Sequence, residues 1–196
     1  MKKLFIASNN GHKIEEIADI LKRNRIEIEL VCPKDFDCKE EPVENGRTFA
    51  ENARIKARFY YDRFHLPTIA DDSGICIDYL NGNPGIHSAR FLHGMNYDQK
   101  CDYVLELMKD VKNRGAQFVD CMCFIDKDGE IFEYEGINEG QIAFEKAGHE
   151  GFGYDPIFLI PKFNQTEAQL GADYKNEYSH RAKALKKWIS DAKERL

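Results

Sequence analysis

Two adjacent carboxylates interrupt an apolar stretch of the chain, and this feature constrains the fold more than any other. Asp71 and Asp72 stand between the apolar runs 68–70 and 75–77. Such runs predict buried strands, so we expect a strand–turn–strand path with Asp71-Asp72-Ser73-Gly74 at the turn. Burying two carboxylates is costly unless a cation or hydrogen-bond donors offset their charge. The pair therefore predicts either a metal and ligand site or an acidic turn that bonds only to local backbone.

Strand-like runs alternate with helical stripes along the rest of the chain, which predicts an α/β fold. Residues 3–7 and 26–31 predict short strands, and the acidic stretch 33–46 predicts a loop. Thr48, with Glu51 reaching back, predicts a helix start, and Pro67 predicts its end. We expect a helix over 97–108, a β-hairpin or meander over 116–134, and Ser179 as the cap of a final helix. The expected core positions of the first and last helices are Ile14, Ile17, Ala18, Leu21, Ala182, Leu185, Ile189 and Ala192.

Composition limits the classes of function. The 196 residues are 42% hydrophobic, which is globular, and they suffice for one sizeable core or two lobes. The net charge of −6, without a basic stripe, argues against nucleic-acid binding. No apolar stretch approaches the roughly 20 residues of a membrane span, and the apolar start is too short for a signal peptide. Six cysteines without a C-x-x-C pair predict free thiols in a reducing cytoplasm.

A polar segment between the first strand and helix has the composition of an anion-binding site. It contains Ser8, Asn9, Asn10, Gly11, His12 and Lys13. Backbone N–H groups at a helix N-terminus attract anions, and Lys13 adds a positive charge. The spacing differs from that of a Walker A loop. The same residues could also form a capped turn with an exposed lysine.

Two later segments carry aromatic and basic residues. Glycines at 151 and 153 let backbone approach a ligand, while Phe152 and Tyr154 offer flat faces for a base and Asp155 offers an acceptor. Lys175, His180 and Arg181 are expected at the opening of the last helix. Lysine and arginine only donate hydrogen bonds, so they suit a carbonyl oxygen or a phosphate. An ordinary tight turn and a solvated basic helix turn are the structural alternatives.

Taken in order, these motifs resemble the inosine-triphosphate pyrophosphatase family, which removes deaminated purine triphosphates. The resemblance extends over nearly the whole chain. Its segments are Ser8 to Lys13, Gly46 to Ala57 (G-x-T-F-x-E-N-A-x-x-K-A), Ala70 to Gly74 (A-D-D-S-G), Pro84 to Phe91 (P-G-I-x-S-A-R-F), Gly151 to Pro156 (G-F-G-Y-D-P) and Lys175 to Arg181 (K-N-x-x-S-H-R).

The resemblance implies a single α/β domain over 1–196, an elongated mixed sheet flanked by helices, with two lobes, a central cleft and a homodimeric assembly. It implies Mg²⁺-dependent hydrolysis of ITP, dITP or XTP to monophosphate and pyrophosphate, with Asp72 as proton acceptor and metal ligand. It assigns triphosphate binding to Ser8–Lys13, Asn52, Lys56, Ser73 and Gly74. It assigns base contacts to Phe152, Gly153, Tyr154, Asp155, Lys175, His180 and Arg181.

One segment departs from the pattern of many relatives, which carry adjacent glutamates two and three residues ahead of the glycine. Here Glu44 stands two before Gly46, Val43 replaces the other, and Glu40 and Glu41 lie upstream. We expect Glu44 to be the second metal ligand. Two other functions remain open: a triphosphate pyrophosphatase of other base preference, and a non-catalytic nucleotide sensor on the same fold.

Overall fold

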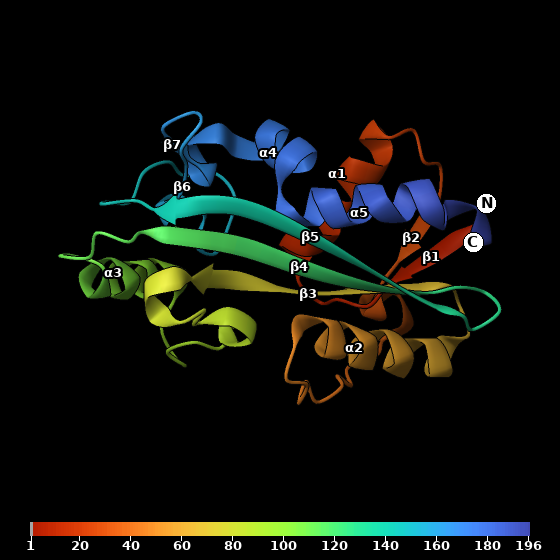
Figure 1. Ribbon diagram of the computed structural model, residues 1–196. Helices are drawn as coiled ribbons and strands as arrows, with labels where there is room; N and C mark the ends of the chain where they lie inside the picture. The colour runs from red at the N-terminus through yellow and green to blue at the C-terminus, as the bar shows by residue number, and fades with distance from the viewer. Residues whose placement is uncertain (1) are drawn as a thin grey trace. The chain divides into compact units, whose positions relative to one another are not determined.

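The computed structural model describes residues 2–196, and its strands form one open mixed sheet with the order β2-β1-β3-β4-β5-β6-β7 (Figure 1). Strand β1 pairs in parallel with β2 and β3, whereas β6 pairs antiparallel with β5 and β7. The predicted α/β fold with a mixed sheet is therefore confirmed. The strands are β1 (Lys3–Ile6), β2 (Glu29–Val31), β3 (Thr68–Ile77), β4 (Gly115–Ile125), β5 (Ile131–Ile142), β6 (Phe158–Ile160) and β7 (Gln165–Thr166).

Five α-helices accompany the sheet in the described part of the chain. They are α1 (Gly11–Arg23), α2 (Phe49–Phe64), α3 (Tyr97–Leu107), α4 (Glu167–Tyr178) and α5 (His180–Asp191). Short 3₁₀ turns are η1 (Pro33–Phe36), η2 (Asp78–Leu80), η3 (Gly85–His87), η4 (Asp155–Ile157) and η5 (Lys193–Arg195). Among the described residues, none of the helices combines the length and apolarity needed to cross a bilayer.

The chain divides into two compact units, which we describe separately. Unit 1 contains the residues up to Asp72, then Asp120–Gly136 and Arg181–Leu196. Unit 2 contains Ser73–Val119 and Ile137–His180. Strands β3, β4 and β5 each contribute residues to both units.

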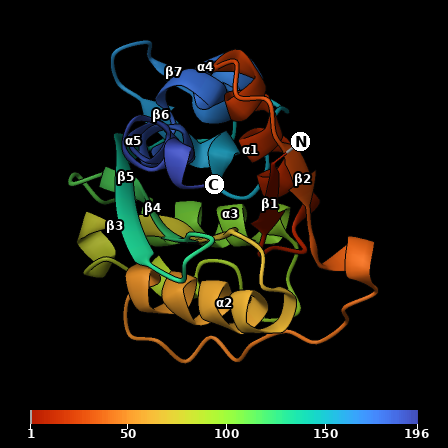
Figure 2. The same cartoon turned by 90° about the vertical axis from the view of Figure 1, so that its right-hand side faces the viewer.

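Unit 1 has a core on each face of its strands. Helices α1 and α5 cover one face and α2 covers the other, as both views show (Figures 1 and 2). The first core includes Ile17, Leu21, Leu185 and the fully buried Trp188. The second core packs Ala53, Ala57 and Tyr60 of α2 around Phe5. The helical stripes predicted from the sequence therefore face the sheet, although Trp188 was not among the expected core residues.

Unit 2 is built around a separate core. Residues of β3 and β4, such as Ile75 and Phe118, pack with Val104 of α3 and with Ile157 and Phe158. Helix α4 contacts η4, β6 and β7. Tyr154 of the loop 151–155 belongs to this core, so the core holds the loop in place.

Three local expectations differ from the structure. Strand β3 runs unbroken from Thr68 to Ile77, so Asp71-Asp72 lies within a strand and not at a turn. Glu51 accepts the N–H of Arg47 at 2.6 Å, not that of the capping residue Thr48. Lys175 lies in the last turn of α4 and not at the start of the final helix, because α4 ends at Tyr178 and α5 begins at His180.

The helix α4 escaped prediction because Gly171 interrupts its periodicity. Gly171 has a φ of 72° and a ψ of −168°, and these values kink the helix. A Cβ at this position would lie 2.3 Å from the Glu150 carboxylate, so the glycine also permits a close approach. Lys175 lies in the last turn of α4, where its positive charge interacts favourably with the negative end of the helix dipole.

Candidate active site

Asp72, in unit 1, is a buried carboxylate that contacts two polar side chains of α2. Its side chain projects from β3 and accepts a hydrogen bond from Asn52 Nδ2 at 3.0 Å, while Lys56 Nζ lies 3.9 Å from Oδ1. Asn52 and Lys56 are one turn apart on α2, so both project from the same face of that helix. Burial raises the pKa of Asp72, an effect that Lys56 and Asn52 oppose. A raised pKa makes Asp72 a stronger base than an ordinary aspartate.

The loop before α2 brings a second carboxylate to the same lysine. Lys56 Nζ lies 3.4 Å from Glu44 Oε1, so this ammonium interacts with both Glu44 and Asp72. The two upstream glutamates bond elsewhere: Glu40 pairs with Arg63, and Glu41 accepts a hydrogen bond from Asn9 at 2.5 Å. Of the three glutamates, Glu44 is therefore the one whose carboxylate shares a cation with Asp72.

The donor set around Asp72 fits a hard divalent cation. Magnesium binds one or two carboxylates and retains several waters. Glu44 and Asp72 offer two, and the negative charge of Glu44 contributes to the raised pKa of Asp72. Groups of three or more histidine, cysteine or acidic side chains suited to a metal are absent among the described residues. Glu44 and Asp72 are therefore the two carboxylates that could hold a divalent cation here.

The segment from Ser8 to Lys13 forms the N-terminus of α1. Asn10 caps the helix by accepting the N–H of His12 at 3.0 Å, and Ser8 Oγ accepts the N–H of Asn10 at 3.1 Å. Lys13 Nζ lies 2.8 Å from Asp71 Oδ2. The capped turn is therefore present, and its lysine is not exposed as the structural alternative expected, because the buried Asp71 binds Lys13.

A buried charge network lies beside this helix end. Arg181 Nη2 is 2.9 Å from Asp71 Oδ2 and 3.6 Å from Asp120 Oδ1, and Nη1 pairs with Glu16. Burial acts to raise the pKa of Asp71, but the charges of Lys13 and Arg181 outweigh it and hold that pKa well below the usual range. Sequence reasoning missed Glu16 and Asp120. Asp120 could have been noticed as a carboxylate inside the apolar run 118–125.

Unit 2 contains the loop 151–155, which we call the aromatic loop because it carries Phe152 and Tyr154. Asp155 Oδ2 accepts the N–H of Phe152 at 2.8 Å and a hydrogen bond from Lys175 Nζ at 2.7 Å. The Lys175 ammonium lies 4.6 Å from the centroid of the Phe152 ring. Tyr154 donates to the carbonyl of Ser88 at 3.1 Å. Asp155 therefore fixes both the loop and the lysine.

Two further unit 2 positions have clear packing reasons. The His180 ring stacks on Phe118, with 4.8 Å between centroids and 17° between planes. Gly74, next to the half-buried Ser73, allows close packing, because a Cβ there would lie 2.3 Å from the carbonyl of Gly85. These contacts fix the side chain of His180 and the backbone of β3.

The site residues predicted from the sequence fall into two groups, one in each unit. Unit 1 brings together Ser8–Lys13, Asn52, Lys56, Asp72 and, next to them, Glu44 and Arg181; unit 2 holds Ser73, Gly74, Phe152, Gly153, Tyr154, Asp155, Lys175 and His180. The unit boundaries fall between Asp72 and Ser73 and between His180 and Arg181.

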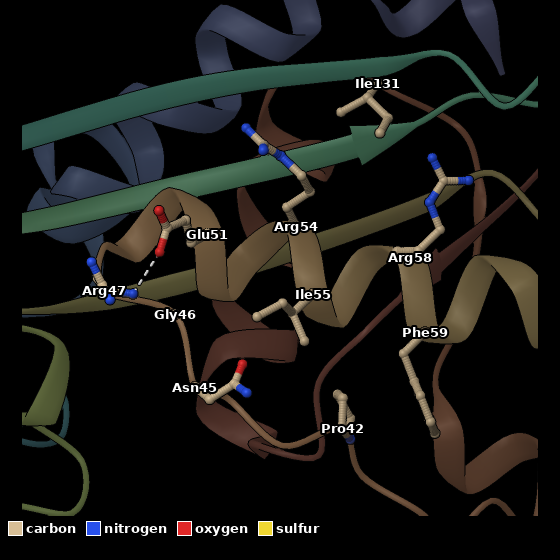
Figure 3. A pocket seen from close by; sticks show the side chains of 10 residues that line it. All are labelled: Pro42, Asn45, Gly46, Arg47, Glu51, Arg54, Ile55, Arg58, Phe59 and Ile131. Carbon is tan, nitrogen blue, oxygen red and sulfur yellow. Dashed lines mark hydrogen bonds between the residues drawn. The ribbon is translucent and has the colours of Figure 1, made fainter.

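A cavity of about 800 Å³ lies elsewhere in unit 1 (Figure 3). Its lining includes Arg54, Ile55, Arg58 and Phe59 of α2, and Ile131. Arg54 is bound by both oxygens of Glu133, and Arg58 pairs with Asp62. The residues that line this cavity include none of the predicted site residues. We place the candidate site at Asp72, where the buried charges lie, and not at this hollow.

Comparisons with known proteins agree with one another. The Ham1 family model matches residues 4–191. The chain is 41% identical over 187 residues to a dITP/XTP pyrophosphatase of Treponema denticola, covering 93% of this chain and 94% of the relative. It is 42% identical to a protein of the same name from Acholeplasma laidlawii, covering 98% and 94%.

Solved structures give the same result. A HAM1 protein from Coxiella burnetii has a TM-score of 0.88 and 35% identity, with coverage of 99% of this chain and 100% of that chain. The Staphylococcus aureus Ham1 protein has a TM-score of 0.86 and 34% identity, with coverage of 96% and 97%.

Proposed function

The chain belongs to the Ham1 family, and we propose that it hydrolyses deaminated purine nucleoside triphosphates such as dITP, ITP and XTP. The products are the nucleoside monophosphate and pyrophosphate. The enzyme is a hydrolase of a phosphoric anhydride, acting between the α and β phosphates. We propose that residues 1–196 act as a single domain.

The observation that carries this proposal is the environment of Asp72. A buried carboxylate with a raised pKa, held by Asn52 and facing Lys56, is suited to accept a proton from water. The water oxygen attacks the α-phosphorus, the bond from that phosphorus to the bridging oxygen breaks, and pyrophosphate leaves. The proton released by the water passes to Asp72.

The triphosphate requires positive charge along its length. We propose that Lys13 and Lys56 supply it from α1 and α2, together with the polar segment Ser8–His12 at the N-terminal end of α1. Magnesium bound by Asp72 and Glu44 would add positive charge at the phosphate oxygens. Asn52, Ser73 and Gly74 complete the proposed phosphate contacts.

We propose that hydrogen-bond donors of the protein recognise the purine base of the substrate. Hypoxanthine and xanthine present a 6-oxo acceptor where adenine presents an amino donor. We propose that Lys175, with His180, faces this edge, so that adenine would leave two donors opposed. Arg181, which the resemblance also assigned to the base, is fully buried and pairs with Asp71 and Glu16. Phe152, Gly153, Tyr154 and Asp155 form one wall, and Asp155 holds Lys175 in place at 2.7 Å.

The proposed activity removes deaminated purines from the nucleotide pool before they enter DNA and RNA.

We further propose that the enzyme acts as a homodimer in the cytoplasm. Sedimentation at micromolar concentration and cell fractionation test these two proposals. Sedimentation as a monomer at that concentration argues against the dimer.

Pyrophosphate release tests the activity. ITP, XTP, ATP, GTP and dTTP are compared under one condition, with and without Mg²⁺. We expect release from ITP and XTP, little from the others, and loss of activity with a chelator. Equal release from all five would point to a pyrophosphatase of broad base preference. Nucleotide binding without release from any of them would favour the non-catalytic sensor.

A further inference from the structure

Asp120 is a fully buried carboxyl group with an unusual lack of donors. It lies on β4 and is 0% exposed. Neither of its oxygens accepts a conventional hydrogen bond from an N–H or O–H group among the described residues. An ionised carboxylate in such surroundings is strongly unfavourable, because it has lost water and gained no donors.

The nearby cations are already matched by two other carboxylates. Lys13 and Arg181 both contact Asp71 Oδ2, at 2.8 and 2.9 Å, and Arg181 also pairs with Glu16. The 3.6 Å distance from Arg181 Nη2 to Asp120 is too long for a hydrogen bond. Lys13 and Arg181 thus pair more closely with Asp71 and Glu16 than with Asp120, which is a third carboxyl group beside the same arginine.

Another acid lies beside Asp120. Asp71 Oδ2 and Asp120 Oδ1, on the adjacent strands β3 and β4, approach the same nitrogen of Arg181, at 2.9 and 3.6 Å, so the two carboxyl groups are neighbours. Two carboxylates form a hydrogen bond only when one of them carries a proton. Asp71 binds both cations and stays ionised, so the carboxyl group of Asp120 carries the proton. Consistent with this, burial and the charge of Asp71 raise the pKa of Asp120 well above its ordinary value.

We infer that Asp120 is a neutral carboxylic acid that donates its O–H to Asp71 and so positions Asp71 as the common acceptor of Lys13 and Arg181. Asp120 is thus a positioning residue, since it acts on a phosphate-binding lysine only through Asp71. A neutral Asp120 also avoids an extra negative charge that would draw Lys13 away from a polyanionic substrate. The effect on turnover rests on the proposed function, whereas the protonation of Asp120 does not.

Infrared spectroscopy of the free protein tests the protonation at neutral pH without substrate. A carboxylic acid has a carbonyl stretch that a carboxylate lacks. We expect this band in the wild type and its loss in Asp120→Asn. Asp126→Asn is the matched control, because Asp126 is buried just after β4 but accepts N–H bonds from Asp128 and Glu130, each at 2.9 Å. A spectrum in which Asp120→Asn removes only carboxylate bands overturns the inference.

A pair of variants tests the positioning role. Asparagine at 120 keeps a neutral donor of the same shape, whereas alanine removes it. We expect Asp120→Asn to keep kcat/KM for ITP within about threefold, and Asp120→Ala to lower it roughly tenfold or more, mainly through KM. Equal damage from both variants, or none from either, overturns the positioning role. A wild type without any hydrolysis contradicts the proposed function instead, and the infrared result still decides the protonation.

Discussion

Lys175 Nζ lies 2.7 Å from Asp155 Oδ2, and both side chains are less than 5% exposed. The same oxygen of Asp155 accepts the N–H of Phe152, and the ammonium sits over the Phe152 ring. A single carboxylate thus fixes the aromatic loop and orients the lysine that we propose reads the base. This arrangement supplies the first prediction.

Lys175→Met keeps the length of the side chain and removes its donors. We expect the ITP-over-ATP ratio of kcat/KM to fall by about tenfold or more, because a donor aimed at the 6-oxo group is lost. The dependence on Mg²⁺ should not change, since Lys175 is not one of the proposed metal ligands and pairs with Asp155. Lys162→Met, at a lysine over the Phe163 ring, is the control. An unchanged ratio in Lys175→Met would mean that the base is read by other residues.

Asp72→Asn removes the proposed proton acceptor and metal ligand. We expect turnover of ITP to fall by roughly 10²-fold or more with the fold retained. Near-normal turnover would contradict the role of Asp72.

The pKa of Asp72 also predicts how kcat/KM depends on pH. Because burial raises this pKa, the basic form is lost on acidification at a higher pH than for an exposed aspartate. The pH profile of kcat/KM in the wild type should therefore fall on the acid side above the range of an ordinary aspartate, about pH 4. An acid limb confined to the ordinary range would show that Asp72 is not the group that controls it.

Arg181→Ala removes the cation that the buried Asp71 shares with the half-buried Glu16. We expect a loss of about 3–5 kcal/mol in the free energy of unfolding, measured by chemical denaturation. Arg58→Ala is the control, because Arg58 is about half exposed and pairs with the exposed Asp62, where such pairs contribute about 0–1 kcal/mol. A small loss in Arg181→Ala would mean that the network contributes little to stability. A large loss makes Lys175 the cleaner probe of base recognition.

Asp120→Asn should change the pH dependence of stability. The folded pKa of Asp120 is raised, so its contribution is fully present below the unfolded pKa of about 3.9 and is lost as pH rises toward the folded value. Relative to Asp120→Asn, the wild type should lose about 1.4 kcal/mol per pH unit over that range. Asp71 has the opposite sign, with stability lost only as pH falls below about 3.9. Parallel stability curves for wild type and variant would contradict a protonated Asp120.

Some predictions that rested on neighbouring residues were confirmed, whereas the capping contact from Glu51 to Thr48 and the turn at Asp71-Asp72 were wrong. The caps at Asn10 and Thr48 need only a side chain and an N–H two or three residues later, so the start of α2 could be read from the sequence. The apolar spacing of α1 likewise follows from local geometry. Helix α4 was missed because Gly171 breaks that spacing, and its kink is accommodated by a partner 21 residues away, Glu150.

The sequence by itself determined the α/β pattern, the helix caps, the family resemblance and the residue types needed for phosphate chemistry. Tertiary structure alone decided that Asp71-Asp72 lies inside a continuous strand, that Glu44 shares Lys56 with Asp72, and that Asp120 meets Asp71. The physical reason is that caps and periodicity are interactions of near neighbours along the chain. Burial and charge pairing depend on residues about 50 to 110 positions apart, such as Asp71, Asp120 and Arg181, which only the folded chain brings together.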